Sequence, residues 1–372
     1  MVKVLHTEWA GGWGGQEVRT ITEMLGVREH GIEVFLACTS HATIGKKALE
    51  HGIPTFYLPF NGTADIRTLT GLMKIIREHD IDIVNTHSGK DTWVGGFAAK
   101  LTGRAFIRTR HLGYRVSSSR LNFINELADH VITTGEPIRE SMIQYNRVKP
   151  ERITSIPSGP DETKFNPAQY ERASYREKWG LAPNDFVVGF VAMMRVMKRH
   201  DLFVEIAHNI LKRHPNVKFV LSGDGPRRGD IEAHIKKLGL EDKFILTGFL
   251  QNPAEILCTF DIFLHPTENE GVPQSVMQAL MMQLPVVATN AGGTGDLQHG
   301  DNFILRPEHD VPGLTEAVCQ LIENPELRAA YANRARDHVV SHFSYNVMID
   351  RVLKVYEQVL ARKGKRLWQP SV

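Results

Sequence analysis

Residues 261–293 read DIFLHPTENEGVPQSVMQALMMQLPVVATNAGG, and this stretch decides the fold class. An apolar run ends at His265, and a polar loop then leads to Pro273. Proline suits the first turn of a helix, because the N–H that it lacks would be unpaired there. The helix is predicted to end before Pro285, and a β-branched strand and the glycine-rich turn 291–293 follow. Strand, loop, helix, strand and turn in this order predict an open α/β sheet.

Both loops of this stretch leave the carboxyl ends of strands, where open α/β sheets bind their ligands. Helix starts with free N–H groups favour a phosphate or pyrophosphate at such a place. Glu270 cannot bind a phosphate, because both groups are negatively charged, but its carboxylate can accept hydrogen bonds from the hydroxyls of a sugar. A phosphate site beside a hydroxyl site indicates a nucleotide-sugar.

The same stretch resembles the donor-site signature of retaining GT-B glycosyltransferases, in particular glycosyltransferase family 4. That family carries Glu-x7-Glu, and this chain has Glu270 at the first position but Gln278 at the second. The resemblance implies that Glu270 approaches the donor sugar and that Gln278 holds the ribose hydroxyls. A hydrogen bond to a neutral group contributes about 0.5–1.5 kcal/mol, against about 1.5–3 for a charged group, so altered or weaker ribose binding is expected. The departure leaves open an atypical or inactive member.

The resemblance extends to two cations that follow a predicted strand at residues 186–192. Arg195 and Lys198 correspond to a pair that clamps the donor pyrophosphate in the family, although their spacing is three where five is frequent. Cations there would stabilise the leaving diphosphate as its charge develops. Simple surface charge is the alternative interpretation. The other donor-binding residues that the resemblance implies are Gly14, Gly15, Gly223, Gly225, Phe249, Gly271, Val272, Pro273, Gly292 and Gly293.

Two histidines follow predicted strands in the first half of the chain, His87 and His111. A lone histidine more often has a structural hydrogen-bonding role than a catalytic one. The resemblance nevertheless implies that His111 contacts the donor sugar, so we group it with Arg195, Lys198 and Glu270 as the predicted catalytic residues. The acceptor side is assigned to His87, Arg110 and Arg115. The basic stretch that contains both arginines is either a solvated surface or a face for phosphorylated acceptors and acidic lipids.

The predicted fold class is α/β, because strands alternate with helices along the whole chain. The resemblance implies GT-B architecture, with two facing Rossmann-like domains, a cleft between them and a C-terminal helix that crosses back. We assign residues 1–165 to an acceptor-side domain, 166–344 to a nucleotide-sugar domain and 345–372 to the crossing helix and a basic tail. The dinucleotide fingerprint G-x-G-x-x-G is absent from the glycine-rich loops at 11–15 and 223–225. The first of these loops is otherwise explained as a tight strand–helix turn.

Two helices of the first domain have a predictable inner face. Apolar residues at helical spacing mark that face. In the helix after the first glycine-rich loop they are Val18, Ile21 and Leu25. In the helix over residues 65–79 they are Ile66, Leu69, Met73 and Ile76.

Composition describes a globular protein without an obvious macromolecular partner. The 372 residues are 42% apolar and 23% charged with a net charge of +2, so no nucleic-acid partner is expected. Cys38, Cys258 and Cys319 lie in apolar contexts, as reduced cysteines of a cytosolic protein do. No signal peptide is recognised, and no apolar run approaches the ~20 residues that span a bilayer. We expect a cytoplasmic protein whose membrane contact, if any, is peripheral at the inner face of the cytoplasmic membrane.

The resemblance implies a retaining glycosyltransferase that moves a sugar from an NDP-sugar to a glycan or lipid-linked acceptor, in lipopolysaccharide or other surface-polysaccharide synthesis. Front-face attack without a metal or other cofactor is expected. Asp80-Ile-Asp82 precedes a strand, and the spacings of His87, His111 and His265 match no zinc motif. Three alternatives remain. They are an NDP-sugar 2-epimerase of the same architecture, an inactive partner subunit, and a periplasmic sugar-binding protein, which the missing signal peptide disfavours.

Overall fold

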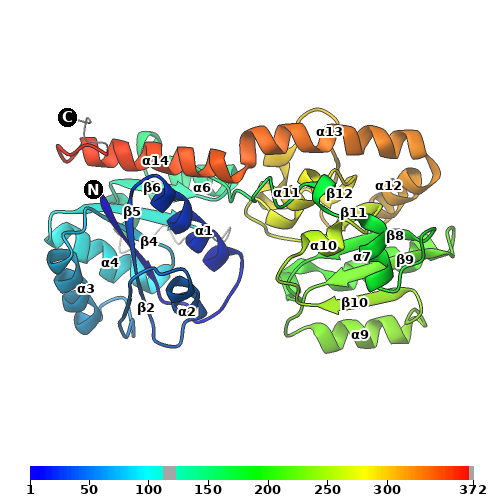
Figure 1. The fold of residues 1–372 in the computed structure, drawn as a ribbon, viewed down its shortest axis with the longest axis horizontal. Coiled ribbons are helices and arrows are strands. Elements are labelled where there is room, and N and C mark those ends of the chain that lie inside the picture. Colours follow the sequence, from blue (N-terminus) through cyan, green and yellow to red (C-terminus); the bar gives the residue numbers. More distant parts are fainter. Residues whose placement is uncertain (112–122, 368–372) are drawn as a thin grey trace. The chain divides into compact units, whose positions relative to one another are not determined.

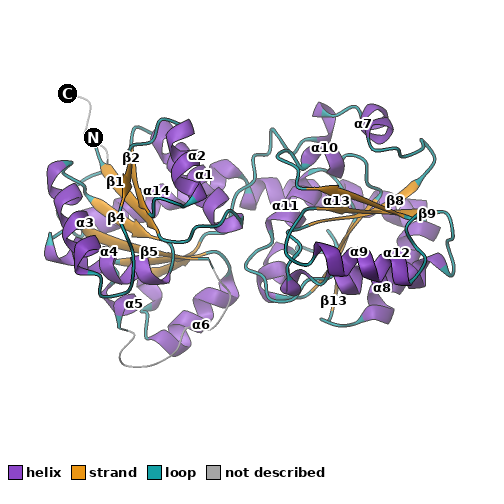
Figure 2. Ribbon diagram, turned by 90° about the horizontal axis from the view of Figure 1, so that it is seen from below, coloured by secondary structure: helices purple, strands orange, loops and turns teal. Residues whose placement is uncertain are grey.

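The computed structural model describes residues 1–111 and 123–367 (Figure 1). The chain forms two compact units, one made of Met1–Gly159 with the segment that begins at Tyr345, the other of Pro160–Ser344. The division lies ahead of the boundary expected at residue 165, because Phe165 is buried in the core of the second unit. Each unit is built on one parallel sheet with helices on both faces (Figure 2), which confirms the predicted α/β class.

The sheet of the first unit has the strand order β3-β2-β1-β4-β5-β6-β7. Its carboxyl edge gathers residues far apart in sequence, because Thr7 of β1 pairs with Thr86 of β4, and Thr86 pairs with Arg108 of β5. Glu8 at the end of β1, His87 after β4 and His111 after β5 therefore lie at the ends of neighbouring strands. The strands are β1 Lys3–Glu8, β2 Glu33–Cys38, β3 Thr55–Tyr57, β4 Ile83–Thr86, β5 Ala105–Arg110, β6 His130–Thr133 and β7 Ile153–Ser155.

Helices cover both faces of this sheet (Figure 2). On one face α1, α2 and α14 bury apolar side chains against the strands, and on the other α3, α4, α5 and α6 do so. Parallel strands covered on both faces read as near-continuous apolar runs, as these do. The helices are α1 Gly15–Glu29, α2 Thr43–Glu50, α3 Ile66–Glu78, α4 Gly89–Leu101, α5 Ile124–Leu127, α6 Glu136–Asn146 and α14 Tyr345–Ala361, with a 3-10 turn η1 at Pro150–Arg152.

The last helix, α14, packs on the first unit beside α1 (Figure 1). The two helices touch closely at Gly26, where an added Cβ would lie 2.3 Å from Cδ1 of Ile349. Tyr356 is fully buried, and its hydroxyl donates to Oε1 of Glu23 at 3.1 Å. The chain thus leaves the first unit at Gly159 and contributes a helix to it again from Tyr345, as predicted.

The second unit has a sheet in the order β10-β9-β8-β11-β12-β13. A single apolar core includes side chains from both of its faces and from α8, α11, α12 and α13. Its strands are β8 Phe186–Val191, β9 Val217–Ser222, β10 Phe244–Gly248, β11 Ile262–His265, β12 Val286–Thr289 and β13 Ile304–Arg306. Its helices are α7 Arg172–Lys178, α8 His200–Leu211, α9 Arg228–Lys237, α10 Ala254–Leu257, α11 Gln274–Met281, α12 Val311–Glu323 and α13 Pro325–Phe343, with 3-10 turns η2 Pro167–Gln169, η3 Val196–Lys198 and η4 Gly292–Leu297.

The predicted helix faces are partly wrong. In α3 the side chain of Ile66 is 72% exposed, and the buried face is formed by Thr68, Leu72, Ile75 and Ile76. Ile66 is the first helical residue after the N-cap Asp65, so its direction is set by the cap and not by the face that packs on the sheet. In α1 the buried face includes the charged residues Glu17, Arg19 and Glu23.

Two further expectations concern cysteines and membrane spans. All three cysteines are free and buried, as predicted. Within residues 1–111 and 123–367, none of the helices is both long and apolar enough to span a bilayer.

Candidate active site

Three loops at the carboxyl edge of the second sheet are fastened to one another. Gly223 and Gly225 have φ values of +139° and +155°, and an added Cβ would lie 2.0 Å from the carbonyl oxygen of Ala192 and 2.7 Å from that of Met194. These positions accept only glycine, which adopts such angles without steric cost. The N–H of Gly223 also donates to the carbonyl of Gly248 at 2.9 Å. The loops after β8, β9 and β10 therefore form one backbone surface.

A second pair of loops meets at Gly292. Its φ is +54°, and an added Cβ would lie 1.9 Å from the carbonyl oxygen of Glu270. Beside it, the N–H of Gly293 donates to the carbonyl of Gly271 at 3.0 Å. The loop that carries Glu270 thus rests directly on the turn after β12, and its position depends on two glycines that leave room for it.

Glu270 is the most deeply buried carboxylate of this edge, with its side chain 9% exposed. Oε1 accepts a hydrogen bond from Nζ of Lys198 and lies 3.5 Å from Nε2 of His265, which in turn lies 2.9 Å from Oγ1 of Thr267. His265 is fully buried. A buried charge is tolerated when it is paired and hydrogen-bonded, and both conditions are met here.

Burial by itself would raise the pKa of Glu270, but the charge of Lys198 and the hydrogen bonds from His265 and Lys198 together outweigh it and lower that pKa to about 2. Burial lowers the pKa of His265, which therefore remains a neutral imidazole. The carboxylate is ionised at neutral pH, so it can accept a hydroxyl hydrogen but cannot donate one.

The loop after β8 ends at Arg199, a cation that forms ion pairs with nearby carboxylates. Arg199 has a left-handed backbone (φ 49°) at the N-cap of α8, and its guanidinium pairs with Asp201 and with Glu268. The N–H of Glu268 donates to the carbonyl of Met197 at 2.9 Å. These bonds tie the polar loop after β11 to the loop that carries Lys198.

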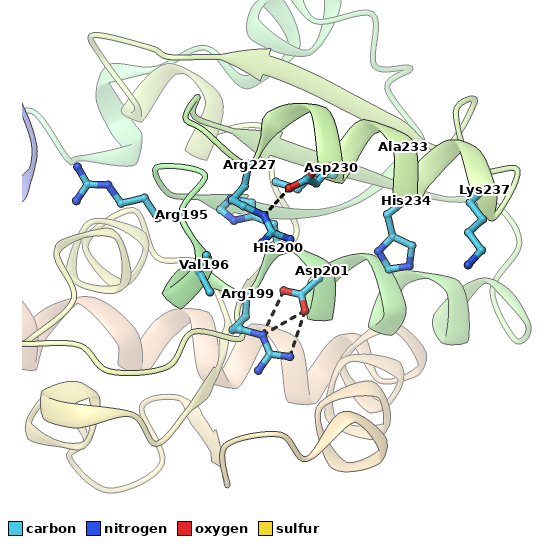
Figure 3. A pocket seen from close by; sticks show the side chains of 11 residues that line it. Arg195, Val196, Arg199, His200, Asp201, Arg227, Asp230, Ala233, His234 and Lys237 are labelled. Carbon is cyan, nitrogen blue, oxygen red and sulfur yellow. Dashed lines mark hydrogen bonds and ion pairs between the residues drawn. The ribbon is translucent and has the colours of Figure 1, made fainter.

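A pocket of about 470 Å³ lies over the N-terminal part of α8 and along α9. Figure 3 shows that Arg199 and Arg227 turn toward Asp201 and Asp230, whereas Arg195 extends away from these acids. Among the residues that the structure describes, Arg195 is exposed and forms no ion pair with a carboxylate. Arg195 is the one predicted donor residue that lines this pocket, so the pocket flanks the loops around Glu270 and does not contain them.

In the first unit, polar side chains fill the carboxyl edge between β1, β4 and β5. Three histidines are joined edge to edge: Nδ1 of His6 lies 2.9 Å from Nε2 of His87, whose Nδ1 lies 3.0 Å from Nε2 of His111. Next to them Glu8 accepts from the N–H of Ala10 at 2.9 Å, and also from Ser88 and Gln16. These bonds connect the strand ends to the glycine-rich loop.

Glu8 and Asp91 are two buried carboxylates of this edge. Asp91 accepts hydrogen bonds from Thr7 Oγ1 and from the N–H groups of His87 and Ser88 at the start of α4, a favourable place for negative charge. Burial, and then the charge of Asp91, raise the pKa of Glu8 to about 8. Glu8 is therefore the member of the pair that stays protonated at neutral pH.

Comparison with known proteins agrees with this architecture. A family model described as Glycosyltransferase Family 4 matches residues 13–164, and one described as Glycosyl transferases group 1 matches residues 185–324. Together the two models span both units.

The chain belongs to the GT-B glycosyltransferases.

Several relatives and solved structures match this glycosyltransferase over nearly its full length. It is 24% identical to a UDP-Gal:alpha-D-GlcNAc-diphosphoundecaprenol alpha-1,3-galactosyltransferase of Escherichia coli, over 97% of this chain and 98% of the relative. Its fold matches a glycosyltransferase of Rickettsia africae with a TM-score of 0.87 and 21% identity, covering 96% of this chain and 98% of that structure. It also matches Anabaena HepE in complex with UDP-glucose, with a TM-score of 0.83 and 19% identity, covering 96% of this chain and all of that structure.

The predicted site residues of the glycosyltransferase fall into two groups. In the second unit, Lys198 and Glu270 are in contact, and the predicted glycines at 271, 292 and 293 and at 223 and 225 shape the same strand edge. Phe249 is 67% exposed and Gln278 partly exposed on α11, so ligands can reach both. Val272 and Pro273 are buried beneath the loop.

The first unit holds the remaining predicted residues, His87, His111, Arg110, Gly14 and Gly15. Gly14 caps α1 with extended backbone and donates its N–H to Glu17 at 2.8 Å, so its conformation does not require glycine. Arg115 lies outside the residues that the structure describes. His87 and His111 lie in the first unit and His265 in the second, and among the described residues no group of His, Cys, Asp and Glu is arranged to hold a metal ion.

Sequence reasoning missed His6, Glu8 and His265 as parts of this site. His6 lies within β1 and His265 ends β11. A single histidine at either place looks like any other buried polar residue, and only the structure shows that His6 adjoins His87. Glu8 is the last residue of β1, immediately before the glycine-rich loop. That position, at the carboxyl end of a parallel strand, is the signal that could have identified it.

The Glu8→Gln variant is expected to flatten the alkaline side of the stability profile. A carboxyl whose pKa is about 8 in the folded state and 4.5 otherwise contributes stability that is fully present below pH 4.5 and is lost as the pH rises through 8. The loss amounts to a few kcal/mol, of order 1.4 kcal/mol for each unit of pKa difference. The Gln variant lacks the titrating group, so its melting temperature should fall less between pH 5 and pH 9 than that of the wild type.

Calorimetry at pH 5, 7 and 9 measures this difference, with Glu50→Gln on the surface of α2 as the control. The variant and the wild type contain the same histidines, so the difference between their melting-temperature profiles reports the titration of Glu8. Parallel profiles for the two proteins would show that Glu8 is ionised in the folded state.

Proposed function

We propose that this glycosyltransferase is a retaining enzyme that transfers a sugar from a UDP-sugar to a glycan or lipid-linked acceptor. The observation that supports it best is the buried, ionised Glu270, paired with Lys198 on loops that the glycines bring together at the carboxyl edge of the second sheet. A fixed carboxylate beside a fixed ammonium group suits a ligand that presents hydroxyls next to a diphosphate.

Each charged group of this edge then has a distinct role toward the donor. Glu270 accepts hydrogen bonds from hydroxyls of the transferred sugar, because its lowered pKa keeps it ionised. Lys198 and the unpaired Arg195 neutralise the diphosphate, whose negative charge grows as the glycosidic bond breaks. The N–H groups at the start of α11 and η4 add partial positive charge to the same edge.

In the proposed reaction, the acceptor oxygen bonds to the anomeric carbon on the face from which the diphosphate leaves. The bond between that carbon and the β-phosphate oxygen breaks with both electrons going to the phosphate. The acceptor proton passes to the same phosphate oxygen, so no side chain has to serve as a base. We propose that the cations, and not a metal ion, carry the charge of the leaving group.

The identity of donor and acceptor is proposed from the relatives. The Escherichia coli relative uses UDP-Gal and a diphosphoundecaprenol-linked sugar, and HepE was crystallised with UDP-glucose. We therefore propose uridine as the base and a lipid-linked glycan of surface-polysaccharide or lipopolysaccharide synthesis as the acceptor. A lipid-linked acceptor would bring the enzyme to the membrane surface by peripheral contact.

Thermal-shift measurements with UDP, GDP, ADP, CMP and dTDP, each with and without EDTA, test the donor site. A ligand at 100 times its Kd stabilises by about 2.7 kcal/mol, which raises the melting temperature measurably. A shift with UDP that EDTA leaves unchanged, and that the Lys198→Met variant loses, is the expected result. No shift with any diphosphate would contradict the proposal and support an inactive partner subunit.

Product analysis tests the reaction itself. UDP-Gal and UDP-Glc are incubated with the enzyme and either a lipid diphosphate-linked sugar or water alone, and the anomeric configuration of the product is read by NMR. An α-linked product from an α-linked donor is expected. An inverted product would refute retention. Epimerisation of the donor in the absence of an acceptor would show that the protein is an epimerase and not a transferase.

A further inference from the structure

Three histidines of the first unit form a continuous chain of hydrogen bonds from the interior to a strand end. His6 on β1 and His87 after β4 are buried, whereas His111 after β5 is partly exposed. The rings of His6 and His87 are nearly coplanar, with an interplanar angle of 9° and centroids 5.2 Å apart. With a nitrogen–nitrogen distance of 2.9 Å, this geometry is an edge-to-edge hydrogen bond and not face-to-face stacking. The bond from His87 to His111, 3.0 Å long, continues the chain.

Each ring of the chain is neutral. Burial lowers the pKa of His6 to about 4, and burial, with the charge of Arg19 among the further causes, lowers the pKa values of His87 and His111 well below the ordinary range. A neutral imidazole carries one N–H and one bare nitrogen. Two neutral rings can therefore bond to each other in only two ways, and all hydrogens of the chain must point in the same direction.

Thr20 of α1 sets that direction. Its hydroxyl donates to the carbonyl of Gln16 at 3.0 Å, which uses its single hydrogen. Thr20 Oγ1 also lies 3.3 Å from Nδ1 of His87, and at that contact it can only accept. Nδ1 of His87 therefore carries the hydrogen, and it faces both Thr20 and Nε2 of His111, which must be bare.

The inner end of the chain supports the same direction. Nε2 of His6 is buried and has no hydrogen-bond partner among the described residues. With the hydrogens directed from His6 to His111, this atom is a bare acceptor. In the reverse direction it would be a buried N–H without an acceptor, and unpaired buried N–H groups are rarer than under-used acceptors.

We propose that His6 and His87 are positioning residues that hold His111 in the tautomer with its hydrogen on Nδ1. His111 then meets a substrate as a hydrogen-bond donor, suited to a hydroxyl or ring oxygen of the sugar. It is not the base that removes the acceptor proton, since its bare nitrogen is occupied by His87. This assignment rests on the proposed transferase function and on the contact with the donor sugar that the family resemblance implies for His111.

Nitrogen NMR of the full-length protein with 15N-labelled histidine tests the tautomers without reference to activity. Single His→Asn replacements assign the three rings. The expected spectrum at pH 7 has a pyrrole-type Nδ1 and a pyridine-type Nε2 for all three residues. A hydrogen on Nε2 of His111 would overturn the proposal, whatever the enzyme transfers.

Two matched pairs of variants connect the chain to catalysis. His6→Phe removes the donor to His87 and keeps the ring shape, whereas the amide of His6→Asn can replace Nδ1 as donor. Thr20→Val removes the acceptor, whereas Thr20→Ser keeps it. We expect His6→Phe and Thr20→Val to mix the tautomers of His111 and to lower kcat about three- to tenfold, the effect of one lost hydrogen bond, while His6→Asn and Thr20→Ser retain the tautomer and most of the rate.

Hydrogen exchange of the α3 and α14 amides, which belong to the same unit as His6 and Thr20, should be similar in all four variants and serves as the folding control. Loss of the tautomer preference without any change in kcat would contradict the positioning role. If the wild type showed the predicted tautomers but transferred no sugar, that result would count against the proposed function. It would not affect the hydrogen-bond assignment of the three histidines.

Discussion

The Lys198→Met variant is expected to lower kcat for sugar transfer by a factor of about 10²–10³, the usual effect of removing one group that stabilises developing charge. Two consequences of the substitution act together. The leaving diphosphate loses a cation, and Glu270 becomes a buried carboxylate whose ion pair is gone. Its pKa should then rise, because burial is no longer opposed by the charge of Lys198.

Initial rates with saturating donor and acceptor measure this effect, and Lys178→Met is the matched control. Lys178 also forms an ion pair, with Glu255 at 2.8 Å, but on the surface of the same unit, where solvent screens the two charges and such pairs add little stability. A Lys198→Met enzyme that kept its rate within threefold would remove Lys198 from the catalytic group.

The acid side of the stability profile provides a second readout of the same pair. Because the pKa of Glu270 is lowered to about 2, its contribution to stability is present above its ordinary value of 4.5 and is lost as the pH falls toward 2. In Lys198→Met that acid-dependent loss should shrink, whereas Lys178→Met should leave it unchanged.

The Arg19→Met variant should cost about 3–5 kcal/mol of stability in the first unit, the penalty for breaking a buried ion pair by removing one partner. Arg19 and Glu23 are both 0% exposed and their charged groups lie 2.6 Å apart. Glu23 also accepts from Asn85 at 3.0 Å and Tyr356 at 3.1 Å, so its charge joins α1 to β4 and to α14. Without Arg19 this charge stays buried and its counter-ion is lost.

Native-state hydrogen exchange of α1 and α14 amides measures the loss within the first unit alone. Lys47→Met, which breaks an exposed pair with Glu50 on α2, is the control and should change stability by less than about 0.5 kcal/mol. The double variant Arg19→Met/Glu23→Gln should recover part of the loss, because a neutral amide is cheaper to bury than a lone carboxylate. An Arg19→Met protein as stable as the control would show that water or another group replaces the ion pair.

Buried charged residues such as Arg19 and Glu23 explain why some helix faces could be predicted from the sequence and others could not. Val276, Met277, Leu280 and Met281 of α11 recur at helical spacing in the sequence, and all four are buried. In α1 the predicted face at Val18 and Leu25 is only partly buried, and Arg19, Glu23 and Thr20 are buried instead. Periodicity assumes that buried residues are apolar, which fails where a helix carries a polar network.

The sequence pattern also did not predict the short strands at two of the sheet edges. β7 and β13 have three residues each and were not predicted as strands. Residues 153–161 look like a crossing segment, and they do lead from the first unit to the second, but Ile153–Ser155 first pairs with β6. A three-residue strand has too few positions for a period, so pairing with an existing sheet determines it.

The sequence by itself determined the α/β alternation and the loops at strand ends, because both depend on local spacing. The family resemblance singled out Lys198 and Glu270 one by one, but their contact joins residues 72 positions apart and depends on the tertiary structure. The tertiary structure decided which charges are buried and in which state. Glu8, Arg19 and His6 look like ordinary polar residues until β1, β4 and α14 enclose them. Burial and neighbouring charge set a pKa, and both depend on residues that are distant in sequence.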